Sequence, residues 1–239
     1  MPNSVVKELI DKTFKELSTP AQPIQRSRIS HTPNGYIHLV PWSNASLLRL
    51  LVKKCTNTLP KSEYRLKAQL DDAARSVIAN IEEGYARPTT SEYLTFLGYS
   101  QASLIEVKGD IQRSRQDGWL VSEPGSSLMG VGVDLKAWHE ALKKSVISQP
   151  TQPLQDPTKP QHVYTAVANA THPPSFIFLY PPVDNLEASL LTYEIFIELI
   201  NKTDWHLRTL VSSLENKLNQ DQKYYKVEQS RIKSTIRMR

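Results

Sequence analysis

The stretch Pro60–Val107 decides the fold; it reads PKSEYRLKAQLDDAARSVIANIEEGYARPTTSEYLTFLGYSQASLIEV. Two apolar series run through it in steps of three and four residues, which is the spacing of one face of a helix. The first series is Leu66, Leu70, Ala73, Val77 and Ile81. The second continues just past the stretch and is Tyr93, Leu97, Ser100, Leu104, Val107 and Ile111. The spacing predicts two amphipathic helices, over 62–84 and 90–117.

Turn signals separate these two helices. Gly84 stands where a left-handed residue closes a helix, and Ala86-Arg87-Pro88 follows as a turn. Thr89 and Glu92 have the spacing of a capping box, in which each side chain accepts a backbone N–H at the start of the next helix. Ser100 places a small residue on the seam, where two helices can approach closely. We therefore expect the two helices to pack tightly across a short turn.

Helical patterns continue on both sides of this stretch. Upstream, an apolar stripe ends before Pro60 and predicts a helix over 44–58. Downstream, alternating steps of four and three residues run from Leu186 to Leu218 and predict a long fourth helix over 185–220. Asp204 is the polar exception in this series. Either it meets a basic partner across a seam, or the helix kinks at 201–203 and exposes it; we favour the kink, because an unpaired buried carboxylate is costly.

The four helices predict an all-α, up-and-down four-helix bundle with N-terminal and proline-rich embellishments. The chain of 239 residues has 8 glycines and 16 prolines, a ratio that favours helices joined by proline-containing loops over a sheet. In chain order we expect an N-terminal helix and small hairpin over 1–42, and then the first three bundle helices over 43–118. An irregular proline-rich insertion follows over 119–184 and contains a short helix over 134–144. The fourth helix over 185–220 and a basic tail over 221–239 complete the chain.

Composition argues against several classes of function. The single cysteine, Cys55, excludes a disulfide framework, and its place on an apolar stripe indicates a buried structural residue. The sequence has no GxxxxGKS or GxGxxG loop, and its six histidines lack the spacing of metal ligands. It also has no run of 18 apolar residues, and its first residues alternate apolar and charged side chains, so we do not expect them to act as a secretory signal. We therefore expect a cytoplasmic, non-catalytic protein with no metal, no cofactor and no membrane partner.

The excess positive charge is concentrated at the C-terminus. Residues 223–239 hold six Lys or Arg and one Glu, whereas the first 222 residues hold 23 basic and 23 acidic residues. Such a tail is typical of contacts with phosphates or acidic surfaces; the competing interpretation is a solvated helix end. The candidate nucleic-acid-binding residues, in this tail and on the first two bundle helices, are Lys223, Lys226, Arg231, Lys233, Arg237, Arg239, Lys53, Lys54, Lys61 and Arg65.

A more specific pattern lies within the same stretch. Its marks are Ala74-x-Ser76-x-x-x-Asn80-Ile81-x-Glu83-Gly84-x-x-Arg87, then Ser91-Glu92-Tyr93 and Ala102-Ser103-Leu104-x-Glu106. The pattern resembles the four-helix bundle family that includes the 23S rRNA intervening-sequence proteins and the accessory variability determinants of diversity-generating retroelements. Leu207-x-x-Leu210-x-x-x-Leu214-Glu215 resembles the closing helix of that family. The likeness covers residues 43–118 and 184–218.

The resemblance implies an accessory protein that forms a homo-oligomer, pentameric in the retroelement relatives, and binds structured RNA or a reverse transcriptase. The alternative is a protein–protein adaptor of the same family, whose long helix docks a partner helix without nucleic acid. Judged from the residues themselves, the motif is mostly structural, with a Glu83–Arg87 pair across the turn. Its members are Ser76, Asn80, Glu83, Gly84, Arg87 and Glu92. Where family members often carry two basic residues, this chain has Asp71-Asp72.

Overall fold

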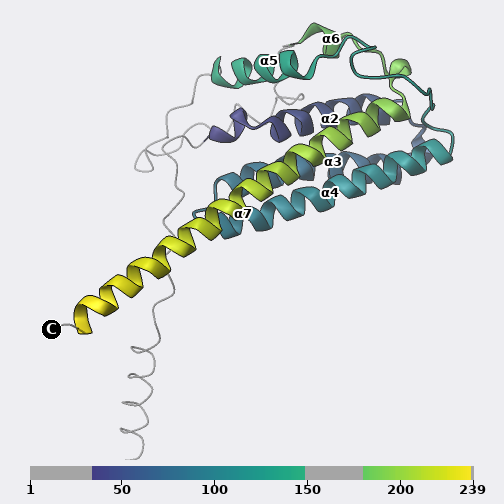
Figure 1. The fold of residues 1–239 in the computed structure, drawn as a ribbon. Coiled ribbons are helices and arrows are strands. Elements are labelled where there is room, and N and C mark those ends of the chain that lie inside the picture. Colours follow the sequence, from purple (N-terminus) through teal and green to yellow (C-terminus); the bar gives the residue numbers. More distant parts are fainter. Residues whose placement is uncertain (1–33, 149–179, 238–239) are drawn as a thin grey trace, which may run out of the picture.

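The computed structural model describes residues 34–148 and 180–237, and every regular element within those ranges is a helix. Four long helices form the body: α2 (Val40–Thr56), α3 (Tyr64–Tyr85), α4 (Thr90–Gln116) and α7 (Tyr193–Arg237). Each packs on two of the others, because α2 and α4 both contact α3 and α7. The colours in Figure 1 show that successive helices alternate in direction. The all-α, up-and-down bundle is therefore confirmed.

The core forms where the predicted stripes meet. Leu70 and Val77 of α3, Leu97 and Leu104 of α4, and Leu207 of α7 are all buried in one cluster. Val211, which follows Leu207 in the alternating apolar series of α7, is half-buried and packs against the cluster. Full burial of a side chain of this size stabilises the fold by about 1.5–3 kcal/mol. The spacing of apolar residues thus identified the inner faces of the helices.

The fourth helix differs from its expected bounds at both ends. It begins at Tyr193 rather than 185, because the preceding residues form a short helix, α6 (Pro181–Asp184), and a 3-10 turn, η3 (Ala188–Leu190). The Thr192 hydroxyl accepts the Ile195 N–H at 3.4 Å at the helix start. The helix then continues to Arg237, so that residues 221–237 are helical and do not form a separate tail. With 45 residues against 27 in α4, α7 is about 68 Å long against about 40 Å.

The expected kink at residues 201–203 is wrong, because α7 is an unbroken helix through this region. Thr203 is the fully buried residue, and its hydroxyl donates to the Leu199 carbonyl at 2.7 Å. Asp204 lies at the edge of the seam, where its Oδ2 accepts from Arg208 Nε at 2.7 Å, one turn further along. A partner on its own helix therefore satisfies the carboxylate, and neither of the two earlier interpretations is needed.

The segment before α2 is not half of a hairpin. Gly35–His38 form a 3-10 turn, η1, that leads into α2, and the Tyr36 ring packs against Trp42 at 5.4 Å between centroids. The buried Ile37 fixes this turn to the core, so residues 36–40 do not form a strand. The expected N-terminal helix and the first hairpin run lie outside the described residues.

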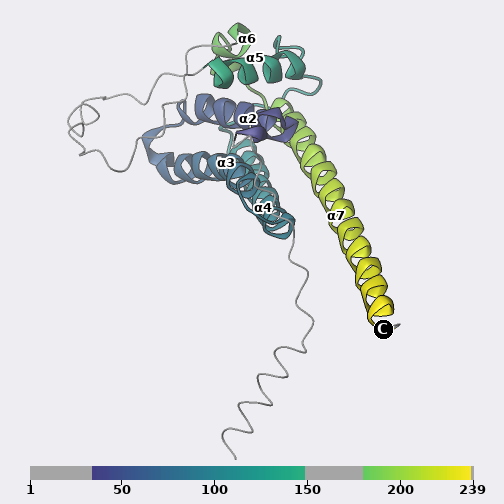
Figure 2. The same cartoon turned by 90° about the vertical axis from the view of Figure 1, so that its left-hand side faces the viewer.

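The connection between α4 and α7 is more regular than expected. It contains α5 (Leu135–Ser148), which starts near its expected position and runs four residues past the expected end at 144. Trp138 anchors α5 on α2, since its Nε1 donates to the Ser43 carbonyl at 2.7 Å. In Figure 2, α5 and α6 lie on the α2 side of the bundle, away from α3 and α4. The proline-rich residues 149–179 lie outside the described residues.

Candidate nucleic-acid interface

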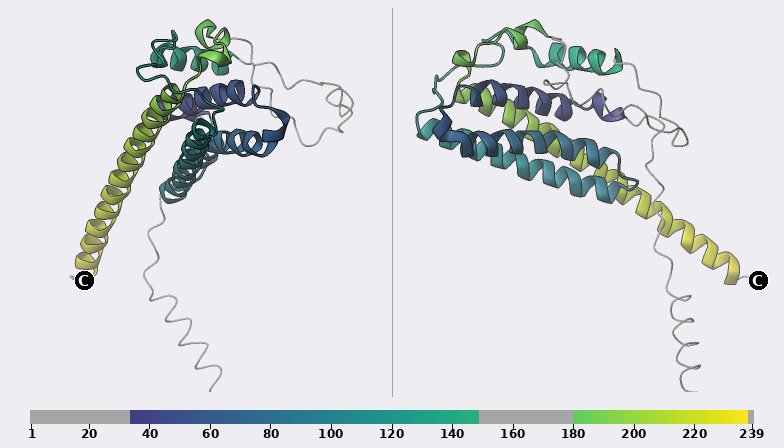
Figure 3. Two further views of the ribbon diagram at one scale, coloured as in Figure 1. Left: turned by 90° about the vertical axis from the view of Figure 1, so that its right-hand side faces the viewer. Right: turned by 180° about the vertical axis from the view of Figure 1, so that it is seen from behind.

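The first group of candidate basic residues lies on the free end of α7. Lys223 and Lys226 are exposed, and Tyr224 between them is 74% exposed. Arg231, Lys233 and Arg237 follow on the same helix, whereas Arg239 lies outside the described residues. Figure 3 shows α7 leaving the bundle and continuing alone. This basic end therefore stands clear of the other three long helices.

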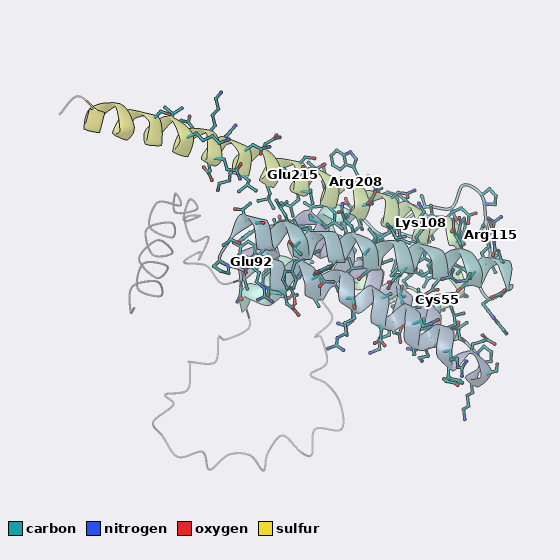
Figure 4. The ribbon with its side chains drawn as sticks, turned by 90° about the horizontal axis from the view of Figure 1, so that it is seen from below. Cys55, Glu92, Lys108, Arg115, Arg208 and Glu215 are labelled. Carbon is teal, nitrogen blue, oxygen red and sulfur yellow. The ribbon has the colours of Figure 1, made fainter. Side chains whose placement is uncertain are left out.

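The second group lies at the opposite end of the bundle. Lys53 and Lys54 are in the last turn of α2. Lys61 lies in the 3-10 turn η2 (Lys61–Glu63) directly before α3, and Arg65 lies in the first turn of α3. In Figure 4, Cys55 and Arg115 mark this end, while Glu92 marks the end beyond which α7 projects. The structure does not bring the two basic groups together, so one compact ligand cannot contact both.

The four residues of the second group have different surroundings. Lys54 is used within the chain, because its Nζ donates to the carbonyls of Asp184 at 3.0 Å and Leu186 at 2.9 Å. It therefore holds the segment before α7 against α2. Lys53, Lys61 and Arg65 are exposed. Three residues of this group thus present their charge to solvent.

Gly84 lies where α3 and α4 pack against each other, a role that the sequence did not reveal. It lies inside α3 and is not a left-handed cap; the described glycines with positive φ are Gly118, Gly125 and Gly132. A Cβ at Gly84 would lie 2.7 Å from Phe96 Cβ and 2.8 Å from Tyr93 Cδ2. The glycine is therefore needed because α3 and α4 approach each other closely, and the expectation of a cap is corrected.

The remaining motif residues stabilise the same hairpin. The capping box is confirmed: Thr89 Oγ1 accepts the Glu92 N–H at 3.1 Å, and Glu92 Oε2 accepts the Thr89 N–H at 3.3 Å. Glu83 and Arg87 form an exposed pair at 4.0 Å, and the Arg87 guanidinium lies 4.4 Å from the centroid of the Phe96 ring. Ser76 and Asn80 are half-buried on α3. The motif therefore forms a packed turn.

Two polar contacts that join α2 to α3 were missed from the sequence. Trp42 Nε1 donates to Glu82 Oε1 at 2.8 Å, and Thr56 Oγ1 donates to Asp71 Oδ1 at 2.8 Å. The first partner lies beside the motif, and the second is the first residue of the Asp71-Asp72 pair. Asp71 therefore has a structural partner within the chain. The only sequence signal was a Trp directly after the proline that opens α2.

Two features bear on the metal and thiol chemistry of the described residues. Within residues 34–148 and 180–237, no group of three or more His, Cys, Asp or Glu side chains could hold a metal ion. Cys55 is buried, and burial, with a smaller contribution from Asp71, raises the pKa of its thiol to about 11. The thiol is therefore protonated at neutral pH and is a poor nucleophile. Among the described helices, none combines the length and the apolar character needed to cross a membrane.

Comparison with known proteins gives one family match within the bundle. Residues 38–131 match the family model of the 23S rRNA-intervening sequence protein. The match contains α2, α3 and α4 complete, and with them the hairpin motif. No curated protein and no solved structure matches the chain. The resemblance that the motif suggested is therefore confirmed for the 23S rRNA-intervening sequence proteins, to whose family model residues 38–131 are similar.

Proposed function

We propose that this chain is a non-catalytic accessory protein that binds structured RNA through the free end of α7. The observation that carries the proposal is the exposure of Lys223 and Lys226 on a helix that has left the bundle. Residues 223–239 hold six basic residues and one acidic residue, while the rest of the chain is balanced. Phosphate groups are therefore drawn to this end by a net charge that the bundle itself lacks.

The aromatic content of this end supports the proposal. Tyr224 is 74% exposed and lies between the two exposed lysines. An exposed tyrosine offers a face on which an unpaired base stacks, while the neighbouring lysines contact the backbone. Structured RNA presents such bases in its loops and bulges.

The resemblance to retroelement accessory factors extends the proposal to partners. In this view the chain forms a homo-oligomer, and its RNA is the template that a reverse transcriptase copies. Several copies would present several α7 ends to one RNA, which raises avidity without any new contact. Lys53, Lys61 and Arg65 would contact a separate RNA segment or another protein, since they lie at the other end of the bundle.

The test is the salt dependence of binding to a structured RNA. Deletion of residues 223–239 removes six basic residues, and the slope of log affinity against log salt should fall in magnitude by about 4 to 5. The matched control replaces Lys53, Lys61 and Arg65 together by Gln, and it should keep most of the slope. If the shortened chain binds as tightly and with the same slope, the free end of α7 is not the contact surface.

An adaptor function is the second candidate, favoured by the apolar residues of the same overhang. Leu218 is half-buried one turn beyond Leu214, which packs on the core, and Val227 is 49% exposed. A partner helix would cover these residues without any phosphate. If the whole chain binds no structured RNA at low salt but captures reverse transcriptase through α7, the adaptor function replaces RNA binding.

A further inference from the structure

A cavity of about 770 Å³ lies between α2, α5, α7 and the loop that precedes α5. Figure 1 shows α5 lying over α2 on one side of the bundle. Val40, Leu128, Val133 and Leu135 supply apolar walls, and Met129 in the same lining is 65% exposed. Cavities of this size, with apolar walls and few polar groups, are typical of small-molecule sites.

Asn44 is the unusual residue of this lining. It is 1% exposed, and neither its Oδ1 nor its Nδ2 has a hydrogen-bond partner among the described residues. A buried amide without a partner is unfavourable, so such a group is rarely left unmatched. A carboxamide offers a donor and an acceptor side by side, and the complementary edge is that of adenine, whose N6 donates and whose N7 accepts.

His139 adds a second directed group. The Ser43 hydroxyl donates to the Val40 carbonyl at 2.9 Å, which uses its one proton. His139 Nδ1 lies 2.9 Å from Ser43 Oγ. Because the Ser43 hydroxyl has no second proton to give, His139 Nδ1 is the donor in this contact. Burial lowers the pKa of His139, so the neutral ring is favoured at neutral pH. Neutral His139 with its proton on Nδ1 presents Nε2 as an acceptor, which suits an exocyclic amino group.

Two of the four charged side chains of the lining are in ion pairs, and the Asp134 carboxylate accepts the backbone N–H groups of Lys136 and Ala137 at the start of α5. Lys202 Nζ donates to Glu198 at 2.6 Å, and Glu140 pairs with Lys143 at 3.2 Å. The ammonium group of Lys136, in contrast, has no hydrogen bond or ion pair with any other described residue. It is the one lysine of the lining whose charge no described carboxylate balances, and a phosphate group would satisfy it.

We propose that this cavity binds an adenine nucleotide, with Asn44 and His139 facing the base and Lys136 facing the phosphate. Because the Asn44 amide is covered in the unliganded chain, the ligand reaches it after a small movement of the lining side chains. The proposal does not depend on RNA binding by α7, since the two surfaces share no residue.

Isothermal titration of the whole chain with AMP, adenosine and inorganic phosphate tests the site. We expect AMP to bind, adenosine to bind more weakly, and phosphate alone not to bind. Asn44→Leu should weaken AMP binding by tenfold or more without lowering the melting temperature of the free chain, since it removes an unpaired amide. The control Asn57→Leu changes an exposed asparagine at the other end of α2 and should leave AMP binding unchanged.

Two further arms make the result specific. Lys136→Gln should weaken AMP binding but not adenosine binding. A short oligoadenylate presents the same adenine edge within RNA, so its affinity is compared with that of AMP. Tighter binding of AMP assigns the site to a free nucleotide. Tighter binding of the oligoadenylate assigns the site to an RNA base. Deletion of 223–239 should leave AMP binding intact, which separates this test from that of RNA binding.

Three outcomes would overturn the proposal. They are no saturable AMP binding at millimolar concentration, unchanged AMP affinity in Asn44→Leu, and a lower melting temperature of free Asn44→Leu. The last outcome would mean that the amide already has a partner within the chain.

Discussion

Leu104 and Ile105 are neighbours in sequence but lie on different faces of α4, at 2% and 67% exposure. Leu104→Ala should lower the free energy of unfolding by about 2–5 kcal/mol, because it leaves a cavity in a packed core. Ile105→Ala should change it by less than about 0.5 kcal/mol, because the side chain is already in water. Urea denaturation of the two variants measures both. Equal effects would show that the seam of α4 is not the inner face of the bundle.

Gly84 and Gly98 provide a second matched pair. Gly84→Ala should destabilise the chain by about 1–3 kcal/mol, because the new methyl group overlaps Phe96 and Tyr93. Gly98→Ala should stabilise it by about 0.4–1 kcal/mol, since nothing lies within 4 Å of the added Cβ and alanine favours a helix. Thermal unfolding compares the two. A stabilising Gly84→Ala would mean that the hairpin is looser than described.

For single residues, the sequence predicted the roles that depend on neighbours along the chain. The Thr89–Glu92 capping box was predictable because both residues belong to one turn. The role of Gly84 was not, because the atoms that exclude a side chain there belong to the next helix. The hydrogen bond between Trp42 and Glu82 joins residues 40 positions apart, and no local rule pairs them.

The docking of α5 on α2 should depend on pH through His139. Burial lowers the pKa of His139 from its usual value of 6.5, so the unfolded chain takes up the proton first as the pH falls. The stability that this group contributes is therefore present above pH 6.5 and is lost as the pH falls through the folded pKa. The stability difference between pH 7.5 and 5.5 should be smaller in His139→Gln than in the unchanged chain. Urea titrations at both pH values measure it, and equal differences would contradict this account.

The positions of whole helices were predictable, but the ends of α7 were not. The apolar steps stop after Leu218, and the predicted helix stopped with them. The chain nevertheless continues as a helix. Most residues from Asp221 onward have helix propensities that allow this, although they add no apolar stripe. At the other end, the four–three pattern extends back through η3, where Leu190 is 52% exposed and belongs to no core.

As a whole molecule, the chain should not be a monomer at micromolar concentration. Helix α7 extends past its neighbours with Leu218 half-buried and Val227 exposed, and Trp205 is 63% exposed on its outer surface. Apolar surface of this kind usually meets a partner. Light scattering should give a multiple of 27.1 kDa, and Leu218→Asp should lower the measured mass. A mass of one chain at every concentration would contradict the prediction.

The separation of the two basic groups is also a property of the whole molecule. Charge alone made both Lys53 and Lys223 candidate nucleic-acid contacts, without saying how far apart they lie. The alternating direction of the helices places the end of α2 and the end of α7 at opposite ends of the bundle (Figure 4). The predicted up-and-down order already contained this information, but charge counting does not use it. The cavity beside Asn44, in contrast, depends on how α5 folds back onto α2, which no pattern in the sequence expressed.

The long connection between α4 and α7 has a consequence for how such chains change over generations. Helix α4 ends at Gln116 and α7 starts at Tyr193, and α5 and α6 occupy part of the interval. In general, doubling the length of a flexible loop raises the free-energy cost of closing it by only about 0.6 kcal/mol. Changes of length that leave α5 and α6 docked on α2 should therefore cost the bundle little, so this interval can vary, and acquire a new pocket, while the four long helices keep their packing.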